Sequence, residues 1–296
     1  MSILLALALQ VGPNPMGGAI QGDELVRDRP QRTPVQPEAE TAEAPDPVSA
    51  WLAGCLGVIE EDPARAHAMA QIRRSETTGA ERVIANHCLG TAAAALELWD
   101  DARTAFTAAR EETPEGEPRA RARFAALAGA ATLGSGDAEG ALGLLTLAES
   151  DAQAAKSPLL EAIAASDRAR ALVALGRGEE ALAALENSTA LAPDRAEGWL
   201  LKATLLRRLE RLPEAQTAIE RAATLAATNP EIALEAGVIA VLAGRDEAAR
   251  KSWQSVLTLA PDGPAAVTAK DYLAQIGEAG ETGLAPEQAP QETPQT

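Results

Sequence analysis

Three alanines, Ala181, Ala215 and Ala249, lie at a constant spacing of 34 residues (215 − 181 and 249 − 215). A fixed period of this size is typical of stacked helical hairpins, in which each repeat is one supersecondary unit. Such a chain buries its apolar surface between neighbouring units rather than around one centre. This spacing therefore constrains the fold more than any other feature of the sequence.

Other residue types recur in phase with these alanines. A small residue stands twelve positions before each alanine and a large apolar residue four positions after it, while glycine and proline mark two of the three turns and ends. The four sets are Ala169, Ala203 and Gly237; Leu185, Ile219 and Trp253; Gly176 and Gly244; Pro193 and Pro261. Small residues let two helices approach, glycine suits the left-handed conformation that ends a helix, and proline disfavours helix at the residue before it.

The unit around Ala215 departs from this pattern at two positions. Glu210 replaces the turn glycine, and Ala227 replaces the closing proline. We expect the turn to form nevertheless, because Pro213 can occupy the first turn of the following helix. We expect Thr228–Pro230 to end the second helix in place of the missing proline.

The fragments "ALGRGEEALAALENSTALAPD" and "LAGRDEAARKSWQSVLTLAPD", with their shared phase, resemble the tetratricopeptide repeat family. The resemblance implies an all-α fold, an α-solenoid whose hairpins form a right-handed superhelix. It also implies that the first helix of each hairpin lines a concave groove, where partners bind. The Lys/Asn clamp by which some relatives hold a chaperone's terminal carboxylate is missing, so that activity is not transferred.

Further hairpins are expected upstream of the regular units, at Val48–Thr78, Val83–Pro114 and Arg121–Ser150. Insertions relative to the period are expected around Glu115–Pro118 and Ser150–Pro158. The total is about six hairpins. The helix expected over Ala265–Ile276 would cap the array, because a solenoid needs a terminal unit with a polar outer face.

Composition agrees with a helical, acidic interaction protein. The chain has 296 residues, a formal net charge of −17 and only 2% aromatic residues. Alanine is the best helix former, and a shortage of aromatic and β-branched residues disfavours sheets. Nucleic acid is excluded as an expected partner, because its binding depends on basic patches that displace counterions.

The sequence divides into four segments: residues 1–10, 11–47, 48–277 and 278–296. Residues 1–10 are apolar but far shorter than the ~20 residues of a membrane span, so we expect no span. They resemble the apolar part of a secretory signal, and the alternative is an ordinary N-terminus. Residues 11–47 read as a disordered Pro/Glu-rich linker, 48–277 as the solenoid and 278–296 as a disordered acidic tail.

The two cysteines, Cys55 and Cys88, fall on expected first helices of adjacent hairpins. Neighbouring first helices pack side by side, so a disulfide is one reading and fits an oxidising compartment. Two buried free thiols are the other reading. The "LAGC" sequence ending at Cys55 resembles a lipidation motif, but the charged, proline-rich residues before it argue against lipidation.

No catalytic, metal or cofactor site is expected. His87 adjoins Cys88, but adjacent residues of a helix point about 100° apart and do not face one another. Zinc is disfavoured because only His67 and His87 could join the cysteines, and no Cys-x-x-Cys spacing exists. Phosphate-binding loops and hydrolase motifs are also missing.

By phase with the family, the groove would be lined by first-helix residues. It would be basic in its middle and apolar toward the C-terminal end. The partner-binding candidates are Arg123, Arg170, Leu200, Thr204, Arg207, Arg208, Leu234 and Val238, with His87, Ser166 and Val173 also on this face. Arg170 and Arg207 could hold a ligand carboxylate, or they could pair with neighbouring glutamates. The four tryptophans are expected to serve packing.

These features favour a non-catalytic scaffold that binds a protein or peptide partner, periplasmic or secreted from a bacterial cell. The alanine-rich, arginine-over-lysine composition suggests a GC-rich bacterial genome. Alternatives are a cytoplasmic adaptor, an enzyme on a helical-repeat frame and a self-associating array. The sequence does not identify the partner or the oligomeric state.

Overall fold

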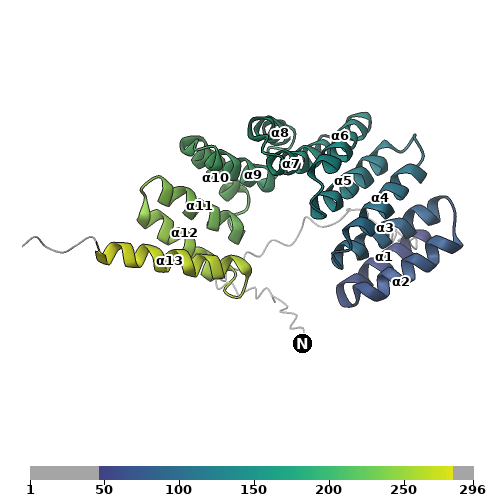
Figure 1. Cartoon of the computed structure of the whole chain (residues 1–296), viewed down its shortest axis with the longest axis horizontal. Helices are drawn as coiled ribbons and strands as arrows, with labels where there is room; N and C mark the ends of the chain where they lie inside the picture. The colour runs from purple at the N-terminus through teal and green to yellow at the C-terminus, as the bar shows by residue number, and fades with distance from the viewer. Residues whose placement is uncertain (1–46, 283–296) are drawn as a thin grey trace, which may run out of the picture. The chain divides into compact units, whose positions relative to one another are not determined.

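The computed structural model describes residues 47–282, and every regular element in that range is an α-helix (Figure 1). The helices are α1 Pro47–Glu61, α2 Pro63–Glu76, α3 Ala80–Ala95, α4 Trp99–Glu112, α5 Pro118–Gly134, α6 Ala138–Ala154, α7 Pro158–Ala174, α8 Gly178–Leu191, α9 Ala196–Arg208, α10 Leu212–Leu225, α11 Pro230–Leu242, α12 Asp246–Leu259 and α13 Pro264–Thr282. The apolar segment 1–10, nearly all of the 11–47 linker and the end of the acidic tail lie outside the described residues. None of the helices between residues 47 and 282 combines the length and apolarity that crossing a bilayer requires.

The helices pair into six hairpins followed by α13. Each helix packs against the next one in the chain, from α1 with α2 through α12 with α13. The expected α-solenoid of about six hairpins is therefore confirmed, and α13 packs on both α12 and α11 as the expected terminal helix. The helix α13 continues to Thr282, beyond Ile276, where we expected the capping helix to end.

Neighbouring hairpins contact one another mainly through the second helix of one and the first helix of the next, and first helices add further contacts. The odd-numbered helices contact one another in the pairs α1–α3, α5–α7, α7–α9, α9–α11 and α11–α13. Among residues 47–282, no two even-numbered helices make comparable contacts. The odd-numbered helices thus pack in series from α5 to α13 and, separately, at α1–α3, and they are the helices expected to line the groove.

The hydrophobic core is divided into clusters along the array. One cluster joins α1–α4, another joins α3–α5, the largest spans α7–α11, and the last joins α11–α13. Alanine supplies many of the buried positions. Each hairpin therefore depends on its neighbours for burial, as expected for a quasi-one-dimensional fold.

Within the hairpins, a small residue on the first helix faces a large one sixteen positions later on the second. A Cβ atom built on Gly90 would lie 2.6 Å from the ring of Phe106, and one on Gly129 would lie 2.6 Å from Leu145. Such distances are too short for real Cβ contacts. Glycine is therefore required at these two crossings, because the large side chain occupies the space of its missing Cβ.

Five of the six turns between the described paired helices contain a residue in the left-handed conformation, and the α1–α2 turn at Asp62 does not. Gly176 and Gly244 have φ values of +72°, and Glu210 occupies the same place in the intervening unit with a φ of +60°. Pro213 lies in the first turn of α10, as expected. The turn thus forms without its glycine, but a residue with a Cβ atom adopts a conformation that is costly for L-amino acids.

The second helix of the unit around Ala215 ends differently from what we expected. The helices α8 and α12 end at Leu191 and Leu259, two residues before their prolines, and α10 ends at the equivalent Leu225. Pro230 is the first residue of α11, and the Asn229 side chain accepts hydrogen bonds from the first amides of that helix. The segment Thr228–Pro230 therefore starts α11 and does not stop α10, because a helix-capping asparagine followed by proline favours a helix N-terminus.

The residues expected as an insertion between Ser150 and Pro158 lengthen the helices α6 and α7 and not the loop between them. The helices α6 and α7 have 17 residues each, whereas α8 has 14. The join between α6 and α7 remains short, since α6 ends at Ala154 and α7 begins at Pro158. The helix α5 likewise has 17 residues and begins at Pro118, within the other expected insertion.

A disulfide joins Cys55 on α1 to Cys88 on α3, with a Cα–Cα distance of 6.3 Å. The two helices pack against each other, and both sulfur atoms are buried in the cluster that joins α1–α4. No free cysteine exists among the described residues. The bond closes a loop that contains the whole of α2.

Candidate functional site

The candidate groove residues all lie on odd-numbered helices, but the structure separates them into three hollows and a set of packed positions. Arg170, Thr204 and Arg208 line one hollow between α7 and α9. Val238 lines a second one at the α11–α13 end, and Arg123 lines a third one beside α5. The remaining candidates are engaged in packing or ion pairs.

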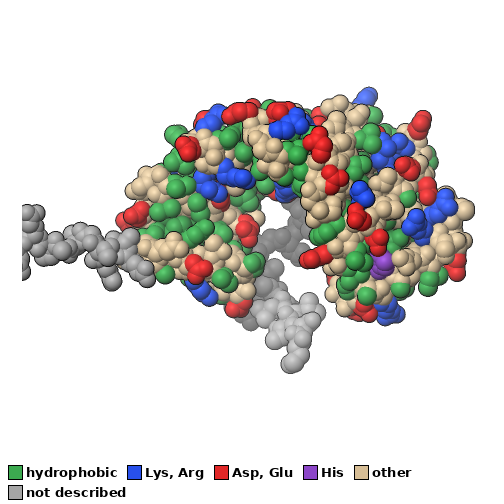
Figure 2. Space-filling model, viewed as in Figure 1, with side chains coloured by type: hydrophobic (Ala, Val, Ile, Leu, Met, Phe, Trp, Pro, Cys, Tyr) green, Lys and Arg blue, Asp and Glu red, His purple; other side chains and the backbone are tan. Residues whose placement is uncertain are grey.

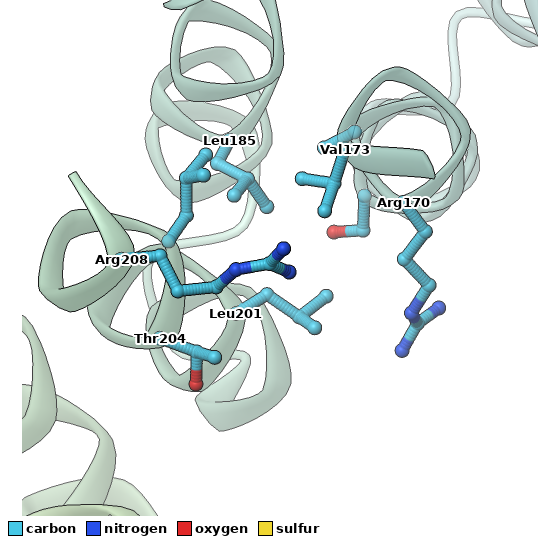
Figure 3. A pocket seen from close by; sticks show the side chains of 9 residues that line it. Arg170, Val173, Leu185, Leu201, Thr204 and Arg208 are labelled. Atoms are coloured by element: carbon cyan, nitrogen blue, oxygen red, sulfur yellow. The ribbon is translucent and has the colours of Figure 1, made fainter. Parts of the chain in front are cut away.

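The α7–α9 pocket has a volume of about 190 Å³ and mostly apolar walls. Val173 from α7, Leu185 from α8 and Leu201 from α9 surround it (Figure 3). Arg208 extends from α9 across the opening, with its guanidinium group beside Leu201 and directed toward Val173, whereas Arg170 points away. A dry apolar cavity of about 150 Å³ can hold a benzene ring, so this pocket has room for one aliphatic or aromatic side chain.

Arg170 is already held by carboxylates of the protein. Its guanidinium donates to Asp167 on the same helix and to Glu197 on α9, and Glu197 also accepts from Arg195. Burial raises the pKa of Asp167, and the nearby charge of Arg170 offsets only part of this effect. Burial also acts to raise the pKa of Glu197, but the hydrogen bond from Arg170 and the charges of Arg195 and Arg170 outweigh it, so this pKa is lowered.

Arg207 is engaged in the same way one repeat later. It donates two hydrogen bonds to Glu235 on α11, of 2.6 and 3.3 Å. Both side chains are mostly buried, with exposed fractions of 24% and 13%. Arg170 and Arg207 therefore follow the alternative expectation, in which the groove arginines pair with neighbouring glutamates. Arg208, by contrast, is exposed and makes no ion pair with any described residue.

The α11–α13 pocket is the apolar end of this surface. It has a volume of about 360 Å³ and is lined by Val238, Val241 and Leu242 of α11 together with Tyr272 of α13. Leu234 does not line it but packs against the cluster that joins α11–α13, and its carbonyl accepts a hydrogen bond from Trp253. Leu200 similarly packs against the α7–α11 cluster. Figure 2 shows acidic and basic side chains intermixed over the part of the array that holds α7–α10.

His87 is buried rather than exposed on the groove surface. Only 6% of the residue is accessible, and its ring meets Phe124 of α5 edge-on at 5.4 Å. Burial lowers the pKa of His87 to about 4, with a further contribution from the positive charge of Arg123. The imidazole is therefore neutral at pH 7. Ser166 is also buried and shares a hydrogen bond with Ser188 of α8.

The tryptophans have different environments. Trp253 is buried, and Trp51 stacks under the guanidinium of Arg73 at 4.7 Å. The Trp99 ring fills the space beside Gly134, whose added Cβ would meet it at 2.8 Å. Trp199 donates to the carbonyl of Pro193. Each ring contacts the protein itself. Among the described residues, no three His, Cys, Asp or Glu side chains gather as a metal site would require.

Comparisons with known proteins support the repeat assignment. A family model described as "Tetratricopeptide repeat" matches residues 166–230 and 200–264. These matches cover the α7–α12 region, where the 34-residue spacing is regular. The segment 166–264 therefore consists of tetratricopeptide repeats. Repeats of this family generally mediate contacts between proteins and are generally non-catalytic.

Solved structures with a similar fold cover more of the chain than the family model does. PilW, titled a widely conserved type IV pilus biogenesis factor, has a TM-score of 0.61 at 16% identity, over 77% of this chain and 97% of its own. Pseudomonas aeruginosa PilF has a TM-score of 0.58 at 15% identity, with the same coverage. At such identities the likeness shows the fold alone. Among curated proteins, none matches this sequence.

Two properties of this tetratricopeptide repeat surface were missed by sequence reasoning. The pairing of Arg170 and Arg207 with glutamates was left as an alternative, although each carboxylate partner, Glu197 or Glu235, lies on the next first helix. That recurring separation of 27 or 28 residues was the available signal. The burial of His87 carried no local signal, because the residue that covers it, Phe124, comes from the next hairpin.

Proposed function

We propose that the chain is a non-catalytic scaffold that binds a protein or peptide partner on the surface of its odd-numbered helices, in a bacterial cell envelope. The observation that carries the proposal is the α7–α9 pocket, in which apolar walls lie beside the free guanidinium of Arg208. Pockets that combine apolar walls with a few polar groups are the usual form of a binding site.

The ligand chemistry follows from the pocket. An apolar side chain of the partner enters between Val173, Leu185 and Leu201, and a neighbouring carboxylate pairs with Arg208. The guanidinium group suits this role because its fork of donors matches a carboxylate. Arg170 and Arg207 hold the helices together through Glu197 and Glu235, so they support the surface rather than contact the ligand.

The envelope location rests on separate observations. The Cys55–Cys88 disulfide favours an oxidising compartment, since such bonds are rare in the cytosol. The apolar run of residues 1–10, which lies outside the described residues, resembles a secretory signal. The alternative is a cytoplasmic adaptor, in which both cysteines would be free thiols. Counting reactive thiols in protein purified from its native compartment distinguishes the two: none supports export, and two contradict it.

The binding proposal is tested by quantitative pull-down from envelope extract. The variants Arg208→Glu and Leu201→Ser alter the α7–α9 pocket, and Arg65→Glu makes the same charge change at an exposed arginine of α2 that forms no ion pair with described residues. We expect recovery of the specific partner to fall about tenfold for Arg208→Glu, as for the loss of a charge-assisted hydrogen bond, and to stay unchanged for Arg65→Glu. Equal recovery by all variants would contradict the assignment.

Arg170→Glu and Arg207→Glu are unsuitable for this test. Each would place a new carboxylate beside Glu197 or Glu235 and destabilise the packing of α9 against α7 or α11. A loss of binding would then report unfolding rather than lost contact. Thermal unfolding of every variant should therefore accompany the pull-down, and Arg208→Glu should unfold within a few degrees of the unaltered chain.

A further inference from the structure

The third hollow shares no lining residue with the α7–α9 pocket. It has a volume of about 690 Å³ and lies between the α4–α5 loop, the first turns of α5 and the join between α6 and α7. Arg119 and Arg123 line it together with Phe124 and Leu160. Residues four positions apart on a helix lie on one face. This site therefore sets two guanidinium groups of α5 beside an aromatic and an aliphatic side chain.

Both arginines lack a carboxylate partner among residues 47–282. Their neighbour Arg121 is occupied differently, since it donates to the carbonyls of Arg110 and Thr113 and fixes the α4–α5 loop. Arg110 in turn pairs with Asp151 at 2.8 Å. The whole chain has 43 acidic and 26 basic residues, so two unpaired arginines on one helix face give this site a charge opposite to that of the chain.

One carboxylate also lines the hollow. Glu117 stands just before α5, but its side chain is exposed and forms no ion pair with Arg119 or Arg123. The local charge therefore remains positive on an otherwise acidic protein. Interactions between exposed charges that lie farther apart than a Debye length of about 8 Å are largely screened, so the distant acidic residues weaken this local attraction little.

We propose that this hollow, the Arg119–Arg123 subsite, binds an acidic residue of a partner peptide together with the apolar residue beside it. The carboxylate lies between the two guanidinium groups, and the apolar side chain rests on Phe124 and Leu160. Bidentate pairing of arginine with carboxylate provides the polar part of the recognition. The inference deepens the proposed function, on which it rests, by adding an acidic residue to the partner's sequence.

His87 provides an independent reporter of occupancy. Its ring touches Phe124, and the charge of Arg123 contributes to holding its pKa low. A carboxylate bound at Arg123 would offset that charge, so the pKa of His87 would rise when the subsite is filled. Mere crowding by an uncharged ligand would not have this effect.

The test is an NMR titration of the full chain with two blocked hexapeptides, EEFLEE and QQFLQQ, each acetylated and amidated. The resonances followed are the Nε atoms of Arg119 and Arg123, the ring of His87 and the methyl group of Thr204 in the α7–α9 pocket. We expect EEFLEE, but not QQFLQQ, to shift the arginine signals and raise the pKa of His87. In Arg119→Glu and Arg123→Glu the peptide should bind about tenfold more weakly, as for one lost charge-assisted hydrogen bond, and in Arg65→Glu with unaltered affinity.

Three outcomes would overturn the subsite. These are no response of the arginines to EEFLEE, an equal response to QQFLQQ, or an equal response to inorganic phosphate or to a single-stranded oligonucleotide. The methyl signal of Thr204 distinguishes failure of the subsite from failure of the proposed function. A shift at Thr204 without one at Arg123 would overturn the subsite and leave the α7–α9 pocket assignment intact. No shift at either residue would overturn both proposals.

Discussion

Gly237 of α11 lies against the indole ring of Trp253 of α12, so closely that a Cβ atom on Gly237 would stand 2.1 Å from the indole nitrogen. That nitrogen donates to the carbonyl of Leu234, one turn earlier on α11, at 3.1 Å. The ring also meets Tyr272 of α13 at 5.0 Å. It is therefore held from both sides, and the glycine cannot be enlarged without moving it.

We expect Gly237→Ala to lower the free energy of unfolding by about 1–3 kcal/mol, the usual cost of overpacking a core. Urea unfolding measures the change. Gly143→Ala is the matched control, because no atom lies within 4 Å of a Cβ there and alanine favours helix. The double variant Gly237→Ala with Trp253→Ile reproduces the Ala203 and Ile219 pair of the preceding unit and should recover stability. A neutral Gly237→Ala would contradict this account of the crossing.

Glu210→Gly should stabilise the protein. Glu210 has a φ of +60°, whereas glycine has this role at Gly176 and Gly244. The left-handed conformation costs an L-residue about 1–2 kcal/mol, and the greater freedom of glycine in the unfolded chain removes part of that gain. We expect a net gain of about 0.5–1 kcal/mol. The mirror variant Gly176→Ala should lose a similar amount, and a destabilised Glu210→Gly would show that the side chain has another role.

Acid should destabilise the protein through His87. The pKa is about 4 in the folded chain against a model-peptide value of 6.5, so the unfolded chain binds the proton more readily. The neutral ring makes its full contribution to the free energy of unfolding above pH 6.5. This contribution falls as the pH drops toward 4, by up to about 3 kcal/mol at 1.36 kcal/mol per pKa unit. Comparing urea unfolding of the unaltered chain and His87→Leu across this range isolates the effect from that of the carboxylates. Parallel pH profiles would contradict it.

Reduction of the Cys55–Cys88 disulfide should loosen the first hairpin. Such bonds typically contribute about 2–4 kcal/mol, and among the described helices α1 packs only on α2 and α3. We expect a reductant to speed amide exchange in α1 and α2 and to leave α11–α13 unchanged. The double variant Cys55→Ala with Cys88→Ala controls for side effects of the reductant. Uniform acceleration along the whole chain would contradict the local model of stability.

Asn86→Leu should raise stability. Asn86 is wholly buried, and neither its amide nitrogen nor its oxygen has a hydrogen-bonding partner among the described residues. A buried polar group without a partner costs about 1–3 kcal/mol. Leucine has a similar size and no polar atom, so thermal unfolding should shift upward. A lower unfolding temperature in Asn86→Leu, with Asn86→Ala as the truncated comparison, would show that the amide is satisfied.

The sequence predicted the fold well in the region where the 34-residue period is regular. It predicted the binding surface only in part. The phase of Ala181, Ala215 and Ala249 located six of the helices of the array, because burial in each unit depends on neighbours at a fixed distance along the chain. The family resemblance, rather than the spacing, indicated that the first helices line the groove. The sequence could not identify which arginine is free, since Arg207 and Arg208 are adjacent in sequence and differ only in the direction in which they leave α9.

The error at Pro230 has a similar origin. A proline between two helices can end the first or begin the second, and both readings use the same residue preferences. The choice is made by Asn229, whose side chain caps α11. The helix α10 ends at Leu225 although no proline follows it at the position equivalent to Pro193 and Pro261.

The division of the core into separate clusters has a consequence for how such a protein can change over generations. A hairpin that touches only its two neighbours can be duplicated, deleted or replaced without redesigning the remainder, so the reach of the array is adjustable in steps of one unit. A new recognition site can then arise at one position of the series while the older ones continue to work.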